Sequence, residues 1–333
     1  MTYKIVVTDY EFPDLHPEDV VVSRAGFMLT PKQCRNEEEL IAACHDADAI
    51  INQYALITAR VINSLEKCQV ISRYGIGLNT IDVSAATARG ICVGNVPDGS
   101  LEEVSDHAIA LLFSLSRGIA KFNSAVKSGK WDYTVVKPLY RTRGRTLGLL
   151  SFGQIPQRVA RKMASFGVKI IACDPFANKS RADELGVDLV DLETLCRQSD
   201  YLSVHVPLTD ATHHILGAEQ FALMKPGAIL VNTARGPVID EQALIEALAS
   251  GRIAGAGLDV FEKEPIGADH PFVTMDNVVL SSHAAWYSED SEVEIRSKAT
   301  QNVVDVLQGR LPTYLANPAV TTLFESKKRL AVN

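Results

Sequence analysis

The chain has 333 residues, of which 47% are hydrophobic and 22% charged, and its formal net charge is −7. This length favours two domains over a single core, and the composition is that of a globular protein. The acidic balance argues against a general nucleic-acid-binding protein, and no apolar run is long enough to cross a bilayer. The first residues lack a signal-peptide pattern, so we expect a cytoplasmic protein. Six scattered cysteines without ligand spacing predict no metal site.

Short β-branched runs alternate with helical patterns in two series. The first series predicts strands at 4–8, 20–23, 49–52, 69–73 and 91–94, with helices at 37–44, 58–65 and 82–89. The second predicts strands at 146–150, 168–173, 187–190, 201–206, 229–232, 255–259 and 278–281, with helices at 156–166, 192–197, 217–223 and 241–249. Nearly continuous apolar strands in such alternation indicate parallel sheets covered by helices on both faces. The fold class is therefore α/β, with two doubly wound domains.

A break in regular structure separates the two series. Pro97 and Gly99 interrupt the pattern, and a long amphipathic helix follows at 101–117. A second long helical pattern, 289–308, comes after the last strand of the second series. We expect this helix to return to the first domain. The prediction is one domain of residues 1–98 and 286–333, and another of residues 99–285.

The turn after strand 146–150 resembles a degraded nucleotide-binding fingerprint. The pattern Gly-x-Gly-x-x-Gly is replaced by Ser151, Gly153 and Pro156. The middle glycine, which lets the backbone approach a pyrophosphate, is kept as Gly153. Pro156 lies in the first helical turn, where a missing N–H costs little. The context of strand, turn and helix still predicts a dinucleotide site.

An anion and a ribose each have a predicted partner in this region. The backbone at Gln154 and Ile155 opens the helix, whose free N–H groups and positive dipole end attract phosphate. Asp174 comes 21 residues after Gly153, where an acidic side chain accepts hydrogen bonds from ribose hydroxyls. An acid there repels a 2′-phosphate, so NAD is favoured over NADP. The alternative is that Asp174 is only a solvated residue at a strand end.

Three complementary side chains follow successive strands of the second series. Arg235 offers a planar guanidinium that matches a carboxylate, and His283 titrates in the range needed to give a proton to an alkoxide. Glu264 is placed to orient that imidazole. Together they fit hydride transfer between a 2-keto acid and a 2-hydroxy acid. Each alone is more often a surface Arg, a loop carboxylate or a half-buried His, but the set supports a catalytic reading.

Asp259 and His107 are two further ionisable side chains of the predicted domain 99–285. Asp259, nearer the cofactor, is expected to bind the nicotinamide carboxamide. His107 lies on the long helix; a histidine on a helix face is more often structural, so it receives no role.

The segments 232–236 and 257–265 and the His283 motif together resemble the D-isomer-specific 2-hydroxyacid dehydrogenases. The segments 75–82 and 205–209 look like the same family. The resemblance covers about residues 3–320 and implies a flavodoxin-like substrate domain (1–98 and 286–333) with an inserted Rossmann NAD-binding domain (99–285). It also implies an active site in the cleft between them.

The resemblance also implies roles for individual residues. The backbone at Ile76 and Gly77 would hold the substrate carboxylate. The helix 101–117 and the arm through Trp131 would form a homodimer interface. The residues that would line the cofactor are Val206, Pro207, Thr212, Thr233 and Ala234.

The run 283–289 is similar to the branch that contains the C-terminal binding proteins, which are NAD(H)-sensing corepressors. In that branch a tryptophan lies over the substrate, which makes Trp286 a candidate selector of apolar or extended keto acids; otherwise it is a packing residue. Three hypotheses remain: a working dehydrogenase, which the complete catalytic set favours; a corepressor-type binding protein; and a cofactor-free degenerate member. The sequence leaves the substrate open among glyoxylate, hydroxypyruvate, other 2-keto acids and 3-phosphoglycerate.

Overall fold

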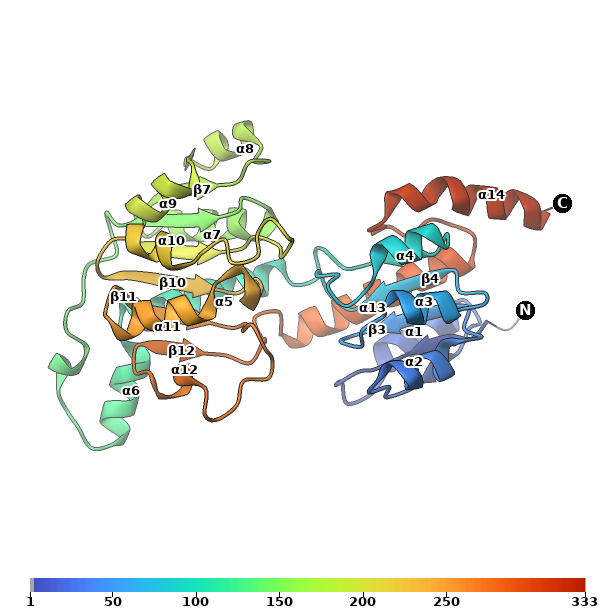
Figure 1. Cartoon of the computed structure of the whole chain (residues 1–333), viewed down its shortest axis with the longest axis horizontal. Helices are drawn as coiled ribbons and strands as arrows, with labels where there is room; N and C mark the ends of the chain where they lie inside the picture. Colours follow the sequence, from blue (N-terminus) through green and yellow to red (C-terminus); the bar gives the residue numbers. More distant parts are fainter. Residues whose placement is uncertain (1–2, 333) are drawn as a thin grey trace. The chain divides into compact units, whose positions relative to one another are not determined.

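The computed structural model describes residues 3–332. The chain divides into two compact units, Met1–Ser100 with Ser288–Asn333 (unit 1) and Leu101–Tyr287 (unit 2). Each unit is built around its own parallel sheet, coloured blue in unit 1 and green to orange in unit 2 in Figure 1. Among the described residues, no helix has both the length and the apolar character that a membrane span requires.

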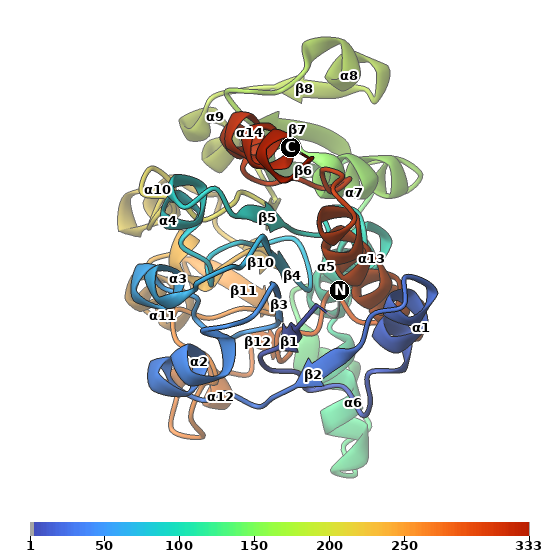
Figure 2. The ribbon, with the colours of Figure 1, turned by 90° about the vertical axis from the view of Figure 1, so that its right-hand side faces the viewer.

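Unit 1 has five parallel strands in the order β2-β1-β3-β4-β5, which is the flavodoxin-like order. The strands are β1 (Ile5–Val7), β2 (Leu29–Pro31), β3 (Ala49–Asn52), β4 (Val70–Arg73) and β5 (Cys92–Gly94). The helices are α1 (His16–Arg24), α2 (Glu37–Cys44), α3 (Ala59–Ser64), α4 (Val83–Ala88), α13 (Glu289–Leu307) and α14 (Thr321–Val332). Figure 2 shows α1 and α13 on one side of the sheet and α2, α3 and α4 on the other. As expected, α13 packs on this first sheet.

The expected strand at 20–23 is wrong, because these residues lie in α1. The valines there are β-branched, but the buried positions are Leu15, Glu18 and Val22, which follow helical spacing. Proline in the first turn and two acidic residues beside it favour a helix start. The second strand of the sheet is instead the short edge strand β2, which is only half-buried.

Unit 2 has seven parallel strands in the order β12-β11-β10-β9-β6-β7-β8. Read from the other edge, the first six follow the Rossmann order. The strands are β6 (Thr146–Leu150), β7 (Lys169–Cys173), β8 (Val187–Leu189), β9 (Tyr201–Val204), β10 (Ala228–Asn232), β11 (Ile253–Leu258) and β12 (Val278–Leu280). All seven were expected from the sequence, within two residues at each end.

Helices cover both faces of this second sheet. The helices are α5 (Leu101–Ser116), α6 (Ile119–Lys127), α7 (Gln154–Ala164), α8 (Lys179–Glu184), α9 (Leu192–Gln198), α10 (Ala218–Leu223), α11 (Glu241–Ala249) and α12 (Pro271–Thr274). Alternate residues of β10 point to two separate apolar clusters: Leu230 packs with residues of α9 to α11, and Val231 with residues of α5 and α7. The two clusters fix the register of the strand, since a slip of one residue would exchange its faces. The α/β fold with two parallel-sheet domains is therefore confirmed.

Candidate active site

Arg235 follows strand β10 in a turn that Asn232 holds in shape. The buried Asn232 side chain accepts a hydrogen bond from the Ala234 amide (2.9 Å) and donates one to the Arg235 carbonyl (3.0 Å). The guanidinium donates to the Ala234 carbonyl at 2.6 Å. The half-buried Arg235 is thus fixed at the carboxyl end of the strand, where ligands bind in open α/β sheets.

The next strand brings Glu264 to the same edge of the sheet. Gly236 packs directly against the backbone of Phe261, so closely that a Cβ atom would overlap the Phe261 carbonyl group. This contact fixes the loop that follows β11 beside the turn that carries Arg235. The Glu264 carboxylate then accepts a hydrogen bond from the Phe261 amide at 2.9 Å.

His283 and Glu264 form the central pair. The imidazole Nδ1 lies 2.7 Å from Oε2 of Glu264, and the two side chains are about a third exposed. Partial burial alone would raise the pKa of Glu264, but its hydrogen bond and charge interaction with His283, the Phe261 amide and the charge of Arg235 together lower it below its ordinary value. The structure therefore brings the three predicted side chains close enough for the charges of His283 and Arg235 to act on Glu264.

A left-handed backbone turn presents the imidazole. His283 has a φ of +55°, in the left-handed region that few residues other than glycine adopt and in which Asn, Asp and His are the most frequent exceptions. Asp259, only 1% exposed, holds this turn: its carbonyl accepts from the His283 amide, and its carboxylate accepts from the amides of Ala284 and Ala285 at 2.9 and 3.0 Å. The Asp259 carboxylate is thus a structural clamp, whatever it offers to a cofactor.

The predicted phosphate site keeps an open cradle. Gly153 precedes α7 without a side-chain cap, and a Cβ there would meet nothing closer than Ser151 Oγ, at 4.0 Å. Gln154 and Ile155 form the first helical positions, and Pro156 is buried in the first turn as expected. An uncapped helix start beneath open space fits a phosphate group.

Ser151 and Asp174 are joined where the ribose is expected. Ser151 has a φ of +87°, which is the conformation that the missing glycine would take. Its hydroxyl donates to Asp174 Oδ2 at 3.2 Å, and the same oxygen accepts from the Phe152 amide at 2.8 Å. The other oxygen accepts from the Phe176 amide at 2.8 Å. Asp174 therefore braces the fingerprint loop from the end of β7.

Thr233 places a buried polar atom at the end of β10. Its hydroxyl oxygen is buried and has no hydrogen-bond partner among the residues that the structure describes. A buried polar atom without a partner costs free energy unless a ligand or water satisfies it. It lies beside Ala234 at the end of β10. On the neighbouring strand end, Thr212 closes the loop after β9 by donating to the Pro207 carbonyl at 2.6 Å, and Val206 is half-buried in that loop.

The residues predicted to contact the substrate lie in both units. In unit 1, Ile76 lies in the loop after β4, where its carbonyl accepts from the Asn95 side chain at 2.8 Å, and Gly77 is next to it. In unit 2, Trp286 is half-buried and meets the Tyr287 ring edge to face, with centroids 5.6 Å apart.

Three residues of this edge were missed by sequence reasoning. Asn232 shapes the Arg235 turn, and its signal was its place inside the 232–236 motif. Ser281 Oγ donates to Asp259 Oδ1 at 2.6 Å, and His107 Nε2 lies 2.8 Å from that hydroxyl. The contact between Ser281 and His107 depends on how α5 packs against the sheet.

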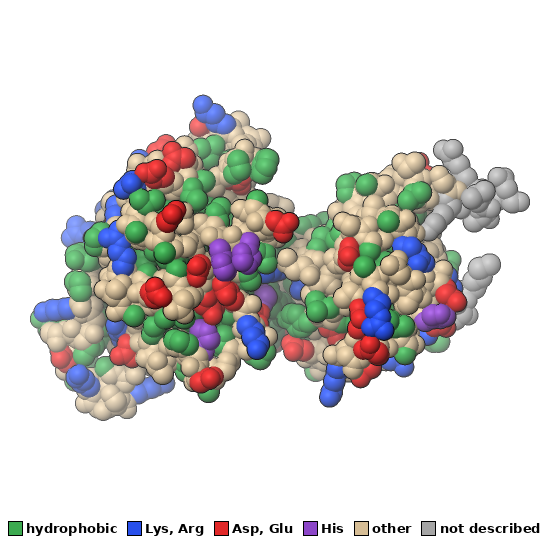
Figure 3. Space-filling model, viewed as in Figure 1, with side chains coloured by type: hydrophobic (Ala, Val, Ile, Leu, Met, Phe, Trp, Pro, Cys, Tyr) green, Lys and Arg blue, Asp and Glu red, His purple; other side chains and the backbone are tan. Residues whose placement is uncertain are grey.

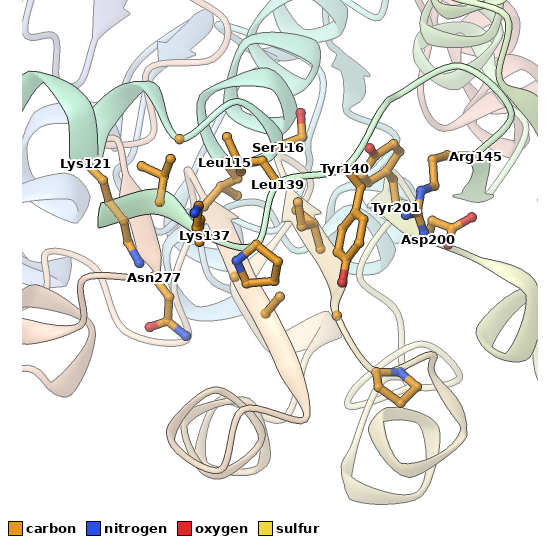
Figure 4. Close-up of a pocket in the computed structure, with 18 residues that line it drawn as sticks. Leu115, Ser116, Lys121, Lys137, Leu139, Tyr140, Arg145, Asp200, Tyr201 and Asn277 are labelled. Carbon is orange, nitrogen blue, oxygen red and sulfur yellow. Dashed lines mark hydrogen bonds and ion pairs between the residues drawn. The ribbon is translucent and has the colours of Figure 1, made fainter. Parts of the chain in front are cut away.

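A cavity of about 410 Å³ lies at the opposite end of the same sheet. Figure 4 shows Asp200 and Tyr201, at the start of β9, on one side of it and Asn277, just before β12, on the other, with Lys137 and Tyr140 of the arm over it. Because ligands of open α/β sheets bind at the carboxyl ends of the strands, this cavity is not the catalytic site.

Histidine and acidic side chains gather on the face of unit 2 seen in Figure 3. Two pairs in this unit are His214 with Glu262 at 2.7 Å and His270 with Glu241 at 2.9 Å. The structure describes no group of three or more His, Cys, Asp or Glu side chains able to hold a metal ion within residues 3–326. They are two separate histidine–carboxylate contacts.

Known proteins resemble the chain over most of its length. The sequence model of the D-isomer specific 2-hydroxyacid dehydrogenase, NAD binding domain, matches residues 109–285. A glyoxylate reductase of Korarchaeum cryptofilum is 39% identical over 289 residues, covering 86% of this chain and 87% of the relative. A hydroxypyruvate reductase of Thermotoga maritima is 42% identical over 250 residues, covering 74% and 80%.

A D-3-phosphoglycerate dehydrogenase of Methanocaldococcus jannaschii is 39% identical over 316 residues; the match covers 94% of this chain but only 59% of that relative. Among solved structures, the holo form of D-mandelate dehydrogenase from Rhodotorula graminis superposes with a TM-score of 0.84 at 30% identity, covering 95% of this chain and 98% of that chain. Because the sequence model of the NAD-binding domain matches more than half of this chain, the chain belongs to the D-isomer specific 2-hydroxyacid dehydrogenase family of oxidoreductases.

Proposed function

We propose that the chain is an NAD-dependent D-2-hydroxyacid dehydrogenase that interconverts a small 2-keto acid and its 2-hydroxy acid. The observation that carries the proposal is the 2.7 Å pair of His283 Nδ1 and Glu264 Oε2 in the field of Arg235. A proton donor, the anion that stabilises its charged form and a carboxylate-binding cation are the groups that this reaction needs.

The pair defines which imidazole nitrogen exchanges the proton. Ionised Glu264 can only accept, so Nδ1 of His283 carries hydrogen, and Nε2 would be the nitrogen that faces the substrate. NADH, when bound, would supply the hydride for C2 of the keto acid. As negative charge develops on the ketone oxygen, Nε2–H gives it a proton, and Glu264 stabilises the imidazolium beforehand. Arg235 holds the substrate carboxylate and polarises the ketone.

The cofactor contacts are proposed from the fit described above. The α7 start at Gly153, Gln154 and Ile155 would hold the pyrophosphate, with Ser151 in the turn before it. Asp174 would accept from the ribose and select NAD over NADP. Asp259 is proposed to bind the nicotinamide carboxamide. The other residues proposed to line the cofactor are Val206, Pro207, Thr212, Thr233 and Ala234. The partnerless hydroxyl of Thr233 supports this placement most directly.

The substrate is proposed to be a small 2-keto acid. The relatives are named for glyoxylate and hydroxypyruvate, which are 2-keto acids, and for 3-phosphoglycerate, which is a 2-hydroxy acid. Ile76 and Gly77 would hold the substrate carboxylate through their backbone, and Trp286 would restrict the substituent on C2. A cytoplasmic location remains a prediction.

A corepressor-type role is less well supported. The relatives quoted above are named as reductases or dehydrogenases, and the acid–base pair is complete. Turnover separates the two. We expect the purified protein to oxidise NADH, followed by its absorbance, with at least one member of a panel of 2-keto acids. NADH binding without turnover across the panel would favour the corepressor-type protein, and absence of NADH binding would reject both.

We propose that the protein is a homodimer through α5 and the arm that follows it. The arm between α5 and β6 exposes large apolar side chains, including Trp131 at 91% and Tyr133 at 71% exposure. Exposed apolar groups of this size on one segment mark interaction surfaces. We expect a dimer by analytical ultracentrifugation and a shift toward monomer in Trp131→Glu, whereas a monomeric wild type would contradict the proposal.

A further inference from the structure

Helix α5 lies unusually close to the sheet of unit 2. A Cβ atom on Gly257 would come within 2.8 Å of Leu111 Cβ, and one on Gly255 within 3.0 Å of the Leu115 side chain. The two glycines are two residues apart on β11, and the two leucines are four apart on α5. Two strand residues advance about 6.6 Å and four helical residues about 6 Å, so the two elements run in register.

The next step of this register pairs His107 with Asp259. Continuing toward the carboxyl end of β11, Asp259 follows Gly257 by two residues, and His107 precedes Leu111 by four. The structure places His107 Nε2 at 3.7 Å from Asp259 Oδ1, with Ser281 Oγ between them in the hydrogen-bond chain. Close packing at the glycines thus delivers a helix side chain to the edge of the sheet that carries the active site.

The direction of the hydrogen bonds follows from the donor inventory. The ionised Asp259 carboxylate can only accept, so the single hydroxyl hydrogen of Ser281 points to it at 2.6 Å. Ser281 Oγ must then accept from His107, whose Nε2 carries hydrogen. The chain runs from the helix through the hydroxyl to a carboxylate that also accepts from the amides of Ala284 and Ala285.

We propose that His107 is a positioning residue for His283, acting through Ser281 and Asp259. The chain fixes the Asp259 carboxylate, and that carboxylate holds the left-handed turn that aims the imidazole at Glu264. Because the clamp is 1% exposed, water does not readily replace a lost donor. The inference rests on the proposed function for its kinetic consequence, but the clamp itself is tested without turnover.

The first test is the local exchange of backbone amides in the cofactor-free protein. We expect His107→Leu to speed hydrogen exchange of the 283–285 amides at least about tenfold while the melting temperature and exchange in β6 stay close to wild type. Gln places its amide nitrogen near the position of His Nε2, so His107→Gln should restore slow exchange. Unchanged exchange in His107→Leu, or acceleration spread over the whole of unit 2, would overturn the proposal.

The second test is kinetic. His107→Leu should lower kcat about tenfold with little change in the KM for NADH, and His107→Gln should recover most of it. Ser281→Ala breaks the same chain, so the double variant should be no worse than the more damaged single variant. The matched control is Ser282→Ala, because Ser282 is exposed and next in sequence. Additive losses, or equal losses in the Ser282 control, would count against the chain.

The two proposals fail in different ways. If the wild-type protein reduces no 2-keto acid, the proposed function is rejected. Hydrogen exchange of the 283–285 amides then still decides whether His107 holds the turn. If the wild-type protein is active and His107→Leu has the same hydrogen exchange and the same kcat, the proposed function stands and the positioning role of His107 is rejected.

Discussion

Ser151 Oγ lies 3.2 Å from Asp174 Oδ2, so the residue that replaces a fingerprint glycine is tied to the acid predicted to bind the ribose. Ser151 keeps the positive φ that the glycine would have. The hydrogen bond offsets part of the cost of that conformation. The loss of glycine at this turn is therefore compatible with a working dinucleotide loop.

Ser151→Gly and Ser151→Ala separate the strain from the hydrogen bond. Both remove the hydroxyl, but only glycine relaxes the left-handed backbone, so the Gly variant should be more stable than the Ala variant by about 1 kcal/mol in urea unfolding. As a control, Gly186→Ala should be destabilising, because Gly186 also has positive φ (+66°) and no atom near a Cβ. Equal stability of the two Ser151 variants would show that the turn is unstrained.

Asp174→Asn should weaken NAD binding and narrow the preference for NAD over NADP. It removes the negative charge that repels a 2′-phosphate and leaves one oxygen, which can accept from only one of the two amides that Asp174 braces. Dissociation constants for both cofactors, measured by fluorescence, give the ratio directly. An unchanged ratio would reject the ribose role, and a large loss of melting temperature would show that bracing the loop dominates.

Gly236→Ala should push the turn that carries Arg235 away from the loop that carries Glu264. The new methyl group would overlap the Phe261 carbonyl, and forced overpacking of this kind costs about 1–3 kcal/mol. We expect a lower melting temperature together with a fall in kcat. Gly217→Ala is the control, since its φ is −125° and a Cβ there makes only ordinary contact at 3.7 Å. Full activity in Gly236→Ala would mean that this contact does not position the site.

The lowered pKa of Glu264 predicts how acid affects the pair. Its interaction with His283 is fully present above the ordinary value of 4.5 and is lost as the pH falls through the lower folded value. The wild-type protein should therefore have a higher melting temperature than Glu264→Gln at neutral pH. The difference between the two melting temperatures should vanish well below pH 4.5. A difference that persists after protonation would assign the stabilisation to packing instead of charge.

Much of the fold could be predicted because periodicity and strand-end chemistry are local properties. The seven strands of unit 2 and the positions of residues 235, 264 and 283 after successive strands are of this kind. The expected strand at 20–23 failed because tertiary burial of Leu15, Glu18 and Val22 decided for a helix. The role of His107 depends on how closely α5 packs on β11. Its only sequence sign is the pairing of glycines two apart with leucines four apart, which becomes readable once the two elements are known to be in contact.

The most direct test of the catalytic account is the activity of His283→Ala, with NADH binding measured on the same sample. Removing the proton donor should lower kcat for keto-acid reduction by about 10²–10⁴-fold while the dissociation constant for NADH stays within a few-fold of wild type. Turnover at the wild-type rate in His283→Ala would contradict the assignment of this imidazole as the acid–base group.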